Sequence, residues 1–149
     1  MAMVHVQDDE GRTGASSTHA EAFTSNVTSG SIVCGGVWWT SLTITLSSVA
    51  QSAGTATIGT VTLLSNPTDD AAGNSARAAM WYAVVTGTGS LTMTYTCSAA
   101  TNISVVQAEA SGVDTVTPLK GSAMQAQSNP GTGTDAILSG ATPAAVTDD

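Results

Sequence analysis

A strict two-residue alternation marks the middle of the chain. From Leu91 to Cys97 every odd position is apolar or cysteine, and every even position is threonine. Alternation with this period puts one kind of side chain on each face of a β-strand, so it predicts a strand with one buried and one wet face. Residues 42–46 and 60–63 alternate in the same way. Because no segment shows convincing 3.6-residue periodicity, the pattern predicts an all-β chain.

Other runs are apolar at successive positions, over residues 32–39, 78–85 and 103–106. They predict strands covered on both faces, or strands whose second face meets a neighbouring subunit. Clusters of turn-forming residues separate the runs at short intervals, which favours an antiparallel β-sandwich of jelly-roll or immunoglobulin-like type. The expected strands lie near residues 3–8, 20–27, 31–39, 41–49, 57–65, 76–86, 90–97, 102–110, 120–127 and 134–139.

The two ends of the chain differ from its middle. Residues 8–19 are polar and turn-rich, so we expect an N-terminal arm over 1–19 with a short strand at Val4–Val6, and a β-sandwich domain over 20–149. The sequence stops on two aspartates where a sandwich usually closes with another strand. Either a neighbouring chain supplies that strand, or the polypeptide has been cut or recorded short.

Composition excludes several partners. The net charge is −8, and Thr, Ser, Ala and Gly fill just over half of the 149 positions. Surfaces that bind nucleic acid or anionic membranes need clustered Lys and Arg, and this chain has three basic residues in all, so we expect neither partner. No apolar run approaches the roughly 20 residues that span a bilayer.

The compartment is inferred from two opposing signals. The N-terminus lacks the basic start and apolar run of a signal peptide. The Thr/Ser/Gly-rich, Lys-poor composition is nevertheless typical of extracellular proteins. Assembly in a bacterial cytoplasm with release by lysis, as for virion proteins, reconciles the two signals; a secreted protein without its signal is the alternative.

Cys34 and Cys97 both fall in strand-like runs. They could form a disulfide across the sheet if their Cα atoms lie within about 7 Å. Because cytoplasmic assembly is reducing, two buried free thiols are the favoured interpretation.

Four aromatic residues are the main candidates for binding: Trp38, Trp39, Trp81 and Tyr82. Neighbours on a strand point to opposite faces, so Trp38 and Trp39 cannot both enter one core unless both faces are covered. Three interpretations stay open: a subunit interface, plain core packing, and a platform on which sugar rings stack.

The acidic residues predict little chemistry. Glu109 ends an apolar strand without a partner carboxylate or base nearby, so we expect it to accept backbone N–H bonds from the Ser111–Gly112 turn. Asp69, Asp70 and Asn74 could hold Ca²⁺, but their spacing does not fit an EF-hand and a solvated turn is favoured. No nucleophile elbow or phosphate loop occurs, so we expect a non-enzymatic protein without a cofactor or metal.

Four segments in a fixed order carry a family resemblance: residues 23–39, 44–54, 77–82 and 105–112. Together they resemble a β-sandwich module of tailed-phage virion surface proteins and of bacterial extracellular proteins, over roughly residues 20–140. The chain departs from that pattern at Gln51, where an Asp is usual, and at Ala110, where an aromatic is usual. The resemblance implies a surface or decoration module that binds a capsid, a tail or a glycan, and it implies no chemistry.

We therefore expect a structural protein of a virion surface, either a capsid decoration protein or a head–tail accessory protein. Its expected partners are the major capsid protein or another virion protein, and further copies of itself in a homo-oligomer. The alternative is a carbohydrate-binding or adhesion module that stacks sugars on its surface Trp and Tyr residues.

Overall fold

The computed structural model describes residues 3–65 and 76–118, and all of its regular structure is antiparallel β-sheet. The expected all-β fold is therefore confirmed. The strands are β1 (Val4–Ala22), β2 (Ile32–Trp39), β3 (Leu46–Ala53), β4 (Thr57–Ile58), β5 (Thr62–Ser65), β6 (Arg77–Gly87) and β7 (Thr92–Ser111).

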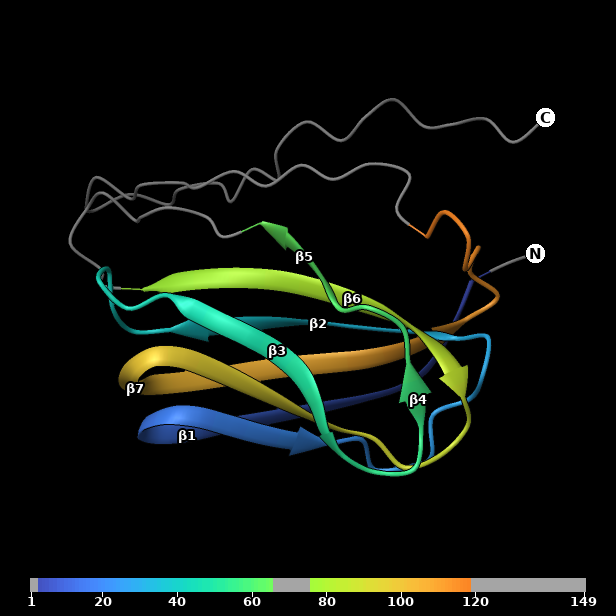
Figure 1. The fold of residues 1–149 in the computed structure, drawn as a ribbon, viewed down its shortest axis with the longest axis horizontal. Helices are drawn as coiled ribbons and strands as arrows, with labels where there is room; N and C mark the ends of the chain where they lie inside the picture. The colour runs from blue at the N-terminus through green and yellow to red at the C-terminus, as the bar shows by residue number, and fades with distance from the viewer. Residues whose placement is uncertain (1–2, 66–75, 119–149) are drawn as a thin grey trace, which may run out of the picture.

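The two longest strands, β1 and β7, pair along their whole length and bend together (Figure 1). The first half of β1 pairs with the second half of β7, and from there the sheet continues through the neighbouring strands β2, β6 and β5. The second half of β1 pairs with the first half of β7, which continues to β3. The sheet therefore curls into a wide layer that contains β2 and β6, and a narrow layer that contains β3.

Side chains alternate between the core and the surface along each central strand. On β6 the odd positions Ala79 to Val85 are buried, and on the second half of β7 the odd positions Ile103 to Glu109 are buried. The largest buried side chains are Trp39, Trp81 and Tyr95, which pack with aliphatic residues between the layers. The two-residue alternation predicted the buried face over residues 91–97, where Leu91, Met93, Tyr95 and Cys97 are buried. Residues 78–85 and 103–106, expected to be covered on both faces or to meet a neighbouring subunit, bury one face in this structure.

Residues 8–19 differ from the polar, turn-rich arm expected from the sequence, because they belong to the continuous strand β1. Their polarity suits an edge strand: Asp8, Glu10 and Arg12 are exposed, whereas the residues between them are half-buried. Charged side chains on an edge discourage unwanted pairing with other chains. The sequence pattern was misleading here because both faces of this edge strand carry mostly polar residues. Apolar residues therefore do not recur at every second position, which is the signal that identifies a strand.

Other expectations on strands also need correction. The strand expected at 20–27 belongs to β1 only up to Ala22, and residues 57–65 form the two short strands β4 and β5. Residues 90–97 and 102–110, expected as separate strands, form the single bent strand β7, and the strand expected at 41–49 begins at Leu46 and ends at Ala53. The strands expected at 120–127 and 134–139 lie outside the described residues.

Candidate functional site

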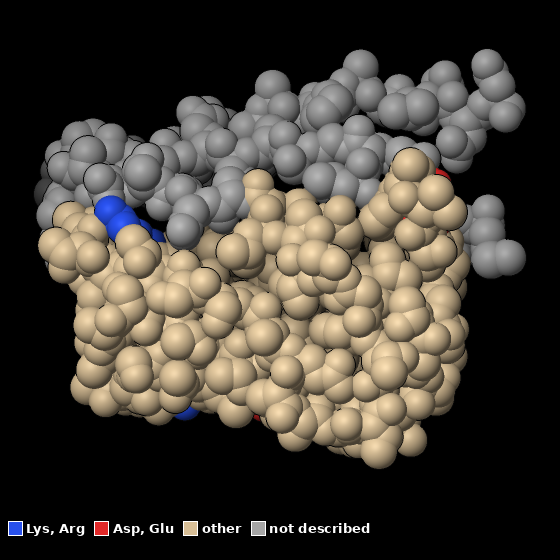
Figure 2. Space-filling view, in the orientation of Figure 1, with Lys and Arg blue, Asp and Glu red and all other residues tan. Residues whose placement is uncertain are grey.

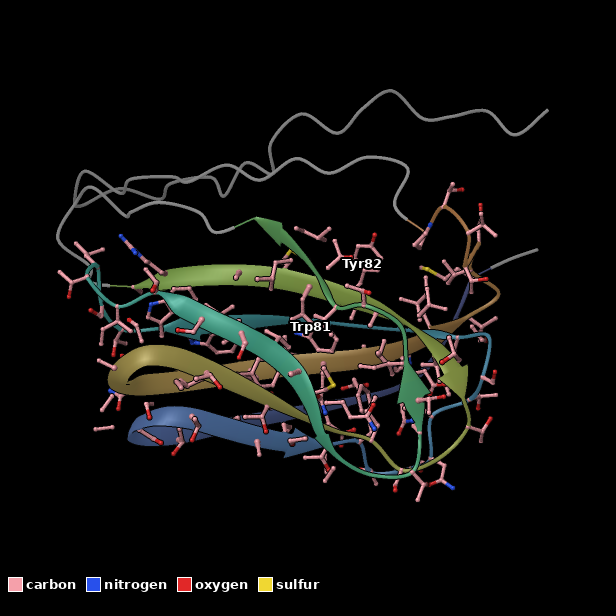
Figure 3. The ribbon with its side chains drawn as sticks, viewed as in Figure 1. Trp81 and Tyr82 are labelled. Atoms are coloured by element: carbon pink, nitrogen blue, oxygen red, sulfur yellow. The ribbon has the colours of Figure 1, made fainter. Side chains whose placement is uncertain are left out.

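The four candidate aromatic residues separate into two environments. Trp39 and Trp81 are 0% and 1% exposed and belong to the core, where the Trp39 indole N–H donates to the Ile44 carbonyl at 2.8 Å. Trp38 is 46% exposed, and Tyr82 is half-buried. In Figure 3 Trp81 lies among the side chains between the layers, and Tyr82 lies at β6 beside β5. Only Trp38 and Tyr82 therefore remain as surface candidates.

These two residues belong to one apolar surface, the side of the wide layer that faces away from the core. Its cross-strand pairs on β2 and β6 are Trp38 with Ala78, Gly36 with Met80, and Cys34 with Tyr82. Strand β7 adds one residue to each of these pairs and so makes three cross-strand rows: Ser104 lies beside Trp38, Val106 beside Gly36, and Ala108 beside Cys34. We call these nine residues the outer face.

The outer face exposes large side chains without any charge among its nine residues. Met80 and Val106 are 48% and 42% exposed and stand on either side of Gly36, which has no side chain. On the neighbouring edge strand β1, the charged residues Asp8, Glu10 and Arg12 continue the same three rows. An exposed patch of large apolar groups with a polar border is typical of a surface that contacts another molecule.

The opposite surface, over the narrow layer, is of a different kind. Its side chains are small, either hydroxyl-bearing or alanine. Thr18, Thr96 and Ser48 pair across the strands in one row, and Ala20, Thr94 and Ala50 in the next. Figure 2, seen from the side of β3, shows very little Lys, Arg, Asp or Glu on this surface. Alternating Thr on a solvated strand explains it, as the sequence predicted.

Cys34 and Cys97 are both free in the structure, so the alternative of a disulfide is not realised. Cys34 lies on the outer face of β2 between Tyr82 and Ala108, whereas Cys97 is buried on β7 opposite Leu46. They belong to different layers and their side chains have different surroundings, which the sequence could not reveal. Burial raises the pKa of both thiols above the usual value.

Two free thiols of unequal accessibility are expected from this arrangement. In native protein, Ellman's reagent should modify Cys34 slowly, and Cys97 should react only after denaturation. The rate at which Cys34 is modified follows the fraction of thiolate. Because the Cys34 pKa is raised, that rate should still rise about tenfold per pH unit at pH 8.5, where an ordinary thiol is half ionised. The control is Cys34→Ser, which should remove the native signal. Thiols that stay silent in denaturant until a reductant is added would contradict the structure.

Glu109 is a buried carboxylate with three donors. Its Oε1 accepts from the Thr28 backbone N–H at 2.8 Å and the Ser31 hydroxyl at 2.7 Å, and its Oε2 accepts from the Gln7 amide at 2.7 Å. The expected structural role fits this geometry, but the partners are not the Ser111–Gly112 turn. They come from β1 and from the segment that precedes β2, 78 to 102 residues away in sequence, so local reasoning could not find them.

A second polar cluster was not anticipated from the sequence. His19 and Glu21 point inward from β1, with the imidazole Nε2 3.0 Å from the Glu21 carboxylate and the ring stacked on Tyr95. The Tyr95 hydroxyl donates to the buried Gln107 at 3.0 Å, and burial raises the Tyr95 pKa above its usual range. The signal available in the sequence was the two-residue spacing of His19 and Glu21, which was hidden because that segment looked like a linker.

The clusters offer little for catalysis within the described residues. His19 and Glu21 have the backbone of Gly11 against them, since a Cβ added to Gly11 would overlap the Glu21 carboxylate. Glu109 is fully committed to its three donors. Both clusters therefore fix the curl of β1 against the rest of the sheet.

Metal binding has no support in residues 3–65 and 76–118, where no three His, Cys, Asp or Glu side chains gather. The weak Ca²⁺ candidates Asp69, Asp70 and Asn74 lie outside the described residues. In the described part of the chain, no helix has the length and apolar character to cross a membrane.

Comparison with known proteins adds no relative to this description. No protein-family model, no curated protein and no solved structure matches the chain.

Proposed function

We propose that this protein is a non-enzymatic structural protein of a virion surface, a capsid decoration or head–tail accessory protein. The observation that carries the proposal is the outer face: an acidic sandwich exposes Trp38, Met80 and Val106 together on one uncharged surface. Interfaces are depleted of charge at their centre and enriched in Trp, Tyr and Met. The composition and the resemblance described above support placing that interface in a virion.

The N-terminal end of β1 is the surface that we assign to shell attachment. Met3, Val4 and Val6 are 73%, 56% and 49% exposed at the start of this edge strand. Their exposed apolar side chains suit contact with a larger partner. The outer face is then left for contacts between accessory subunits.

Co-sedimentation with shell particles that lack this protein tests the proposal. The purified chain should pellet with the particles, and Val4→Ser/Val6→Ser should reduce the bound fraction at least tenfold. Val116→Ser is the matched control, since Val116 is 88% exposed but lies beyond the end of β7. A wild-type chain that stays in the supernatant at every concentration would count against attachment to a shell.

One observation favours a second candidate, a carbohydrate-binding module. Trp38 and Tyr82 lie on the same face, and four residues of β2 separate their rows, about 13 Å along the strand. Aromatic rings on a flat face can stack on successive sugars of a chain. A glycan array with wild-type protein and Trp38→Ala distinguishes this role, because only a sugar platform loses array signal when Trp38 is removed.

A further inference from the structure

The outer face alternates large and small side chains between its two central strands. In the first row Trp38 of β2 stands beside Ala78 of β6. In the second row β2 has Gly36 and β6 has Met80. In the third row β2 has the smaller Cys34 and β6 has Tyr82. In each row one strand has a large side chain, and the other has a small side chain or none, which leaves space beside the large one.

This pattern is complementary to itself under one symmetry operation. A two-fold axis that runs along the strands, midway between β2 and β6, exchanges the positions of these two strands in a facing copy. Each large side chain then meets a small one: Trp38 faces Ala78 of the second copy, and Met80 faces Gly36. Interdigitation of large and small residues is how packed layers reach interior density, and a two-fold contact uses the same patch on both partners.

We propose that the outer face packs against the same face of a second copy of this chain about that axis. Sheets that pack face to face cross at about 30°, so a row about 7 Å from the centre shifts sideways by roughly 3.5 Å. The central row, Gly36 with Met80, does not shift and keeps its partners, whereas the two outer rows shift by more than half the strand spacing of about 4.8 Å, toward the neighbouring strand. The inference rests on the proposed role of the outer face in assembly, and it identifies the molecule that covers this face as a second copy of the chain.

Charge at the contact permits a second copy as the occupant, which the alternation of large and small side chains favours. Two chains of net charge −8 repel each other, but the nine residues of the outer face are uncharged, so contact through this face places no like charges against each other at its centre. With the axis between β2 and β6, strand β1 of each copy lies outside the edge of its partner. Asp8 and Glu10 therefore stay at the solvated rim and do not oppose their counterparts.

The central row allows a reciprocal test. A Cβ added to Gly36 would meet its nearest atoms at 3.7 and 3.9 Å, which is ordinary contact, so Gly36→Met should fold. In a dimer of Gly36→Met, however, the new side chains collide with Met80 of the partner. In a dimer of Met80→Gly, the glycine at position 80 faces Gly36 of the partner, so no side chain fills the central row. We expect each variant alone to dimerise at least tenfold more weakly than wild type in sedimentation equilibrium.

Mixing the two variants should restore the dimer. In the mixed pair each large side chain again faces a glycine, so the heterodimer should form with close to wild-type affinity. Ala20→Met, on the exposed opposite surface, is the matched control and should dimerise like wild type. Circular dichroism melts check that each variant is folded, and the double variant Gly36→Met/Met80→Gly gives a second route to the same restored contact.

Three results would overturn the inference: a wild-type chain that is monomeric up to about 100 µM, single variants that dimerise as well as wild type, or a mixture that dimerises no better than its components. Failure of the proposed function is distinguishable from these. Particle binding by a monomeric wild-type chain removes the two-fold dimer alone, and a two-fold dimer that ignores particles removes the shell attachment alone.

Discussion

Gly35→Ala is expected to destabilise the fold by about 3 kcal/mol, the upper part of the range for overpacked cores. Gly35 is on the inward side of β2, and a Cβ added there would lie 2.4 Å from the Val106 carbonyl oxygen and 2.9 Å from the Trp81 indole nitrogen. The carbonyl belongs to the backbone of the neighbouring central strand, so it cannot move aside without breaking the ladder. Urea denaturation followed by tryptophan fluorescence measures the change.

The neighbouring glycine provides the matched control. Gly36 faces outward, and alanine there should leave the free energy of unfolding unchanged or raise it by about 0.5–1 kcal/mol, because glycine loses more backbone entropy on folding. Of two glycines adjacent in sequence, only Gly35 should thus lower the free energy of unfolding when it is replaced by alanine. Equal effects at both positions would show that β2 does not have the assigned inward and outward faces.

Glu109→Ala is expected to lower the free energy of unfolding by about 2–4 kcal/mol and the melting temperature by on the order of 10 °C. The substitution removes the acceptor of the Thr28 backbone N–H and of one Gln7 amide N–H, whereas the Ser31 hydroxyl keeps the Thr28 carbonyl as an acceptor at 2.6 Å. Each buried group without a partner costs about 1–3 kcal/mol. Differential scanning calorimetry at neutral pH measures the change. Glu10→Ala is the control, because Glu10 is exposed and surface substitutions stay within about 0.5 kcal/mol.

A reciprocal exchange tests the geometry of the same cluster. Glu109→Gln alone turns an amide N–H₂ toward the Gln7 amide, so two donors face each other. Adding Gln7→Glu restores an acceptor at that point, leaves the Ser25 N–H bonded, and keeps the net charge. The double variant should therefore be more stable than Glu109→Gln. A double variant that is less stable than Glu109→Gln would contradict the assigned hydrogen bonds.

Alternation predicted the all-β class and the inward face of the first half of β7, because burial on one side of a strand leaves a two-residue period in the sequence. It could not predict β1, whose charged side chains protect an edge and leave no apolar period. It also could not show that Trp38 is exposed while Trp39 is buried, because both faces of β2 carry apolar residues. That assignment requires the register of β2 against β6 and β7.

The partners of Glu109 were hidden for a different reason. The bend shared by β1 and β7 brings Gln7 and Ser31 to the end of β7 from distant parts of the chain. Sequence reasoning identified the isolated carboxylate and its structural role, but contacts made by the curl of a sheet have no local signature. The same holds for the outer face, whose rows of large and small residues exist only once β2 and β6 are paired.

The exposure of Trp38 tests the central claim, that the outer face is buried in an assembly, most directly. Trp38 is 46% exposed while Trp39 and Trp81 are at most 1% exposed, so acrylamide quenching of tryptophan fluorescence reports on Trp38 alone, with Trp38→Phe as the control. Quenching should be strong at nanomolar concentration and weaken severalfold at tens of micromolar, as the outer face becomes covered. Quenching that is equally strong at every concentration, and unchanged by added shell particles, would contradict the account.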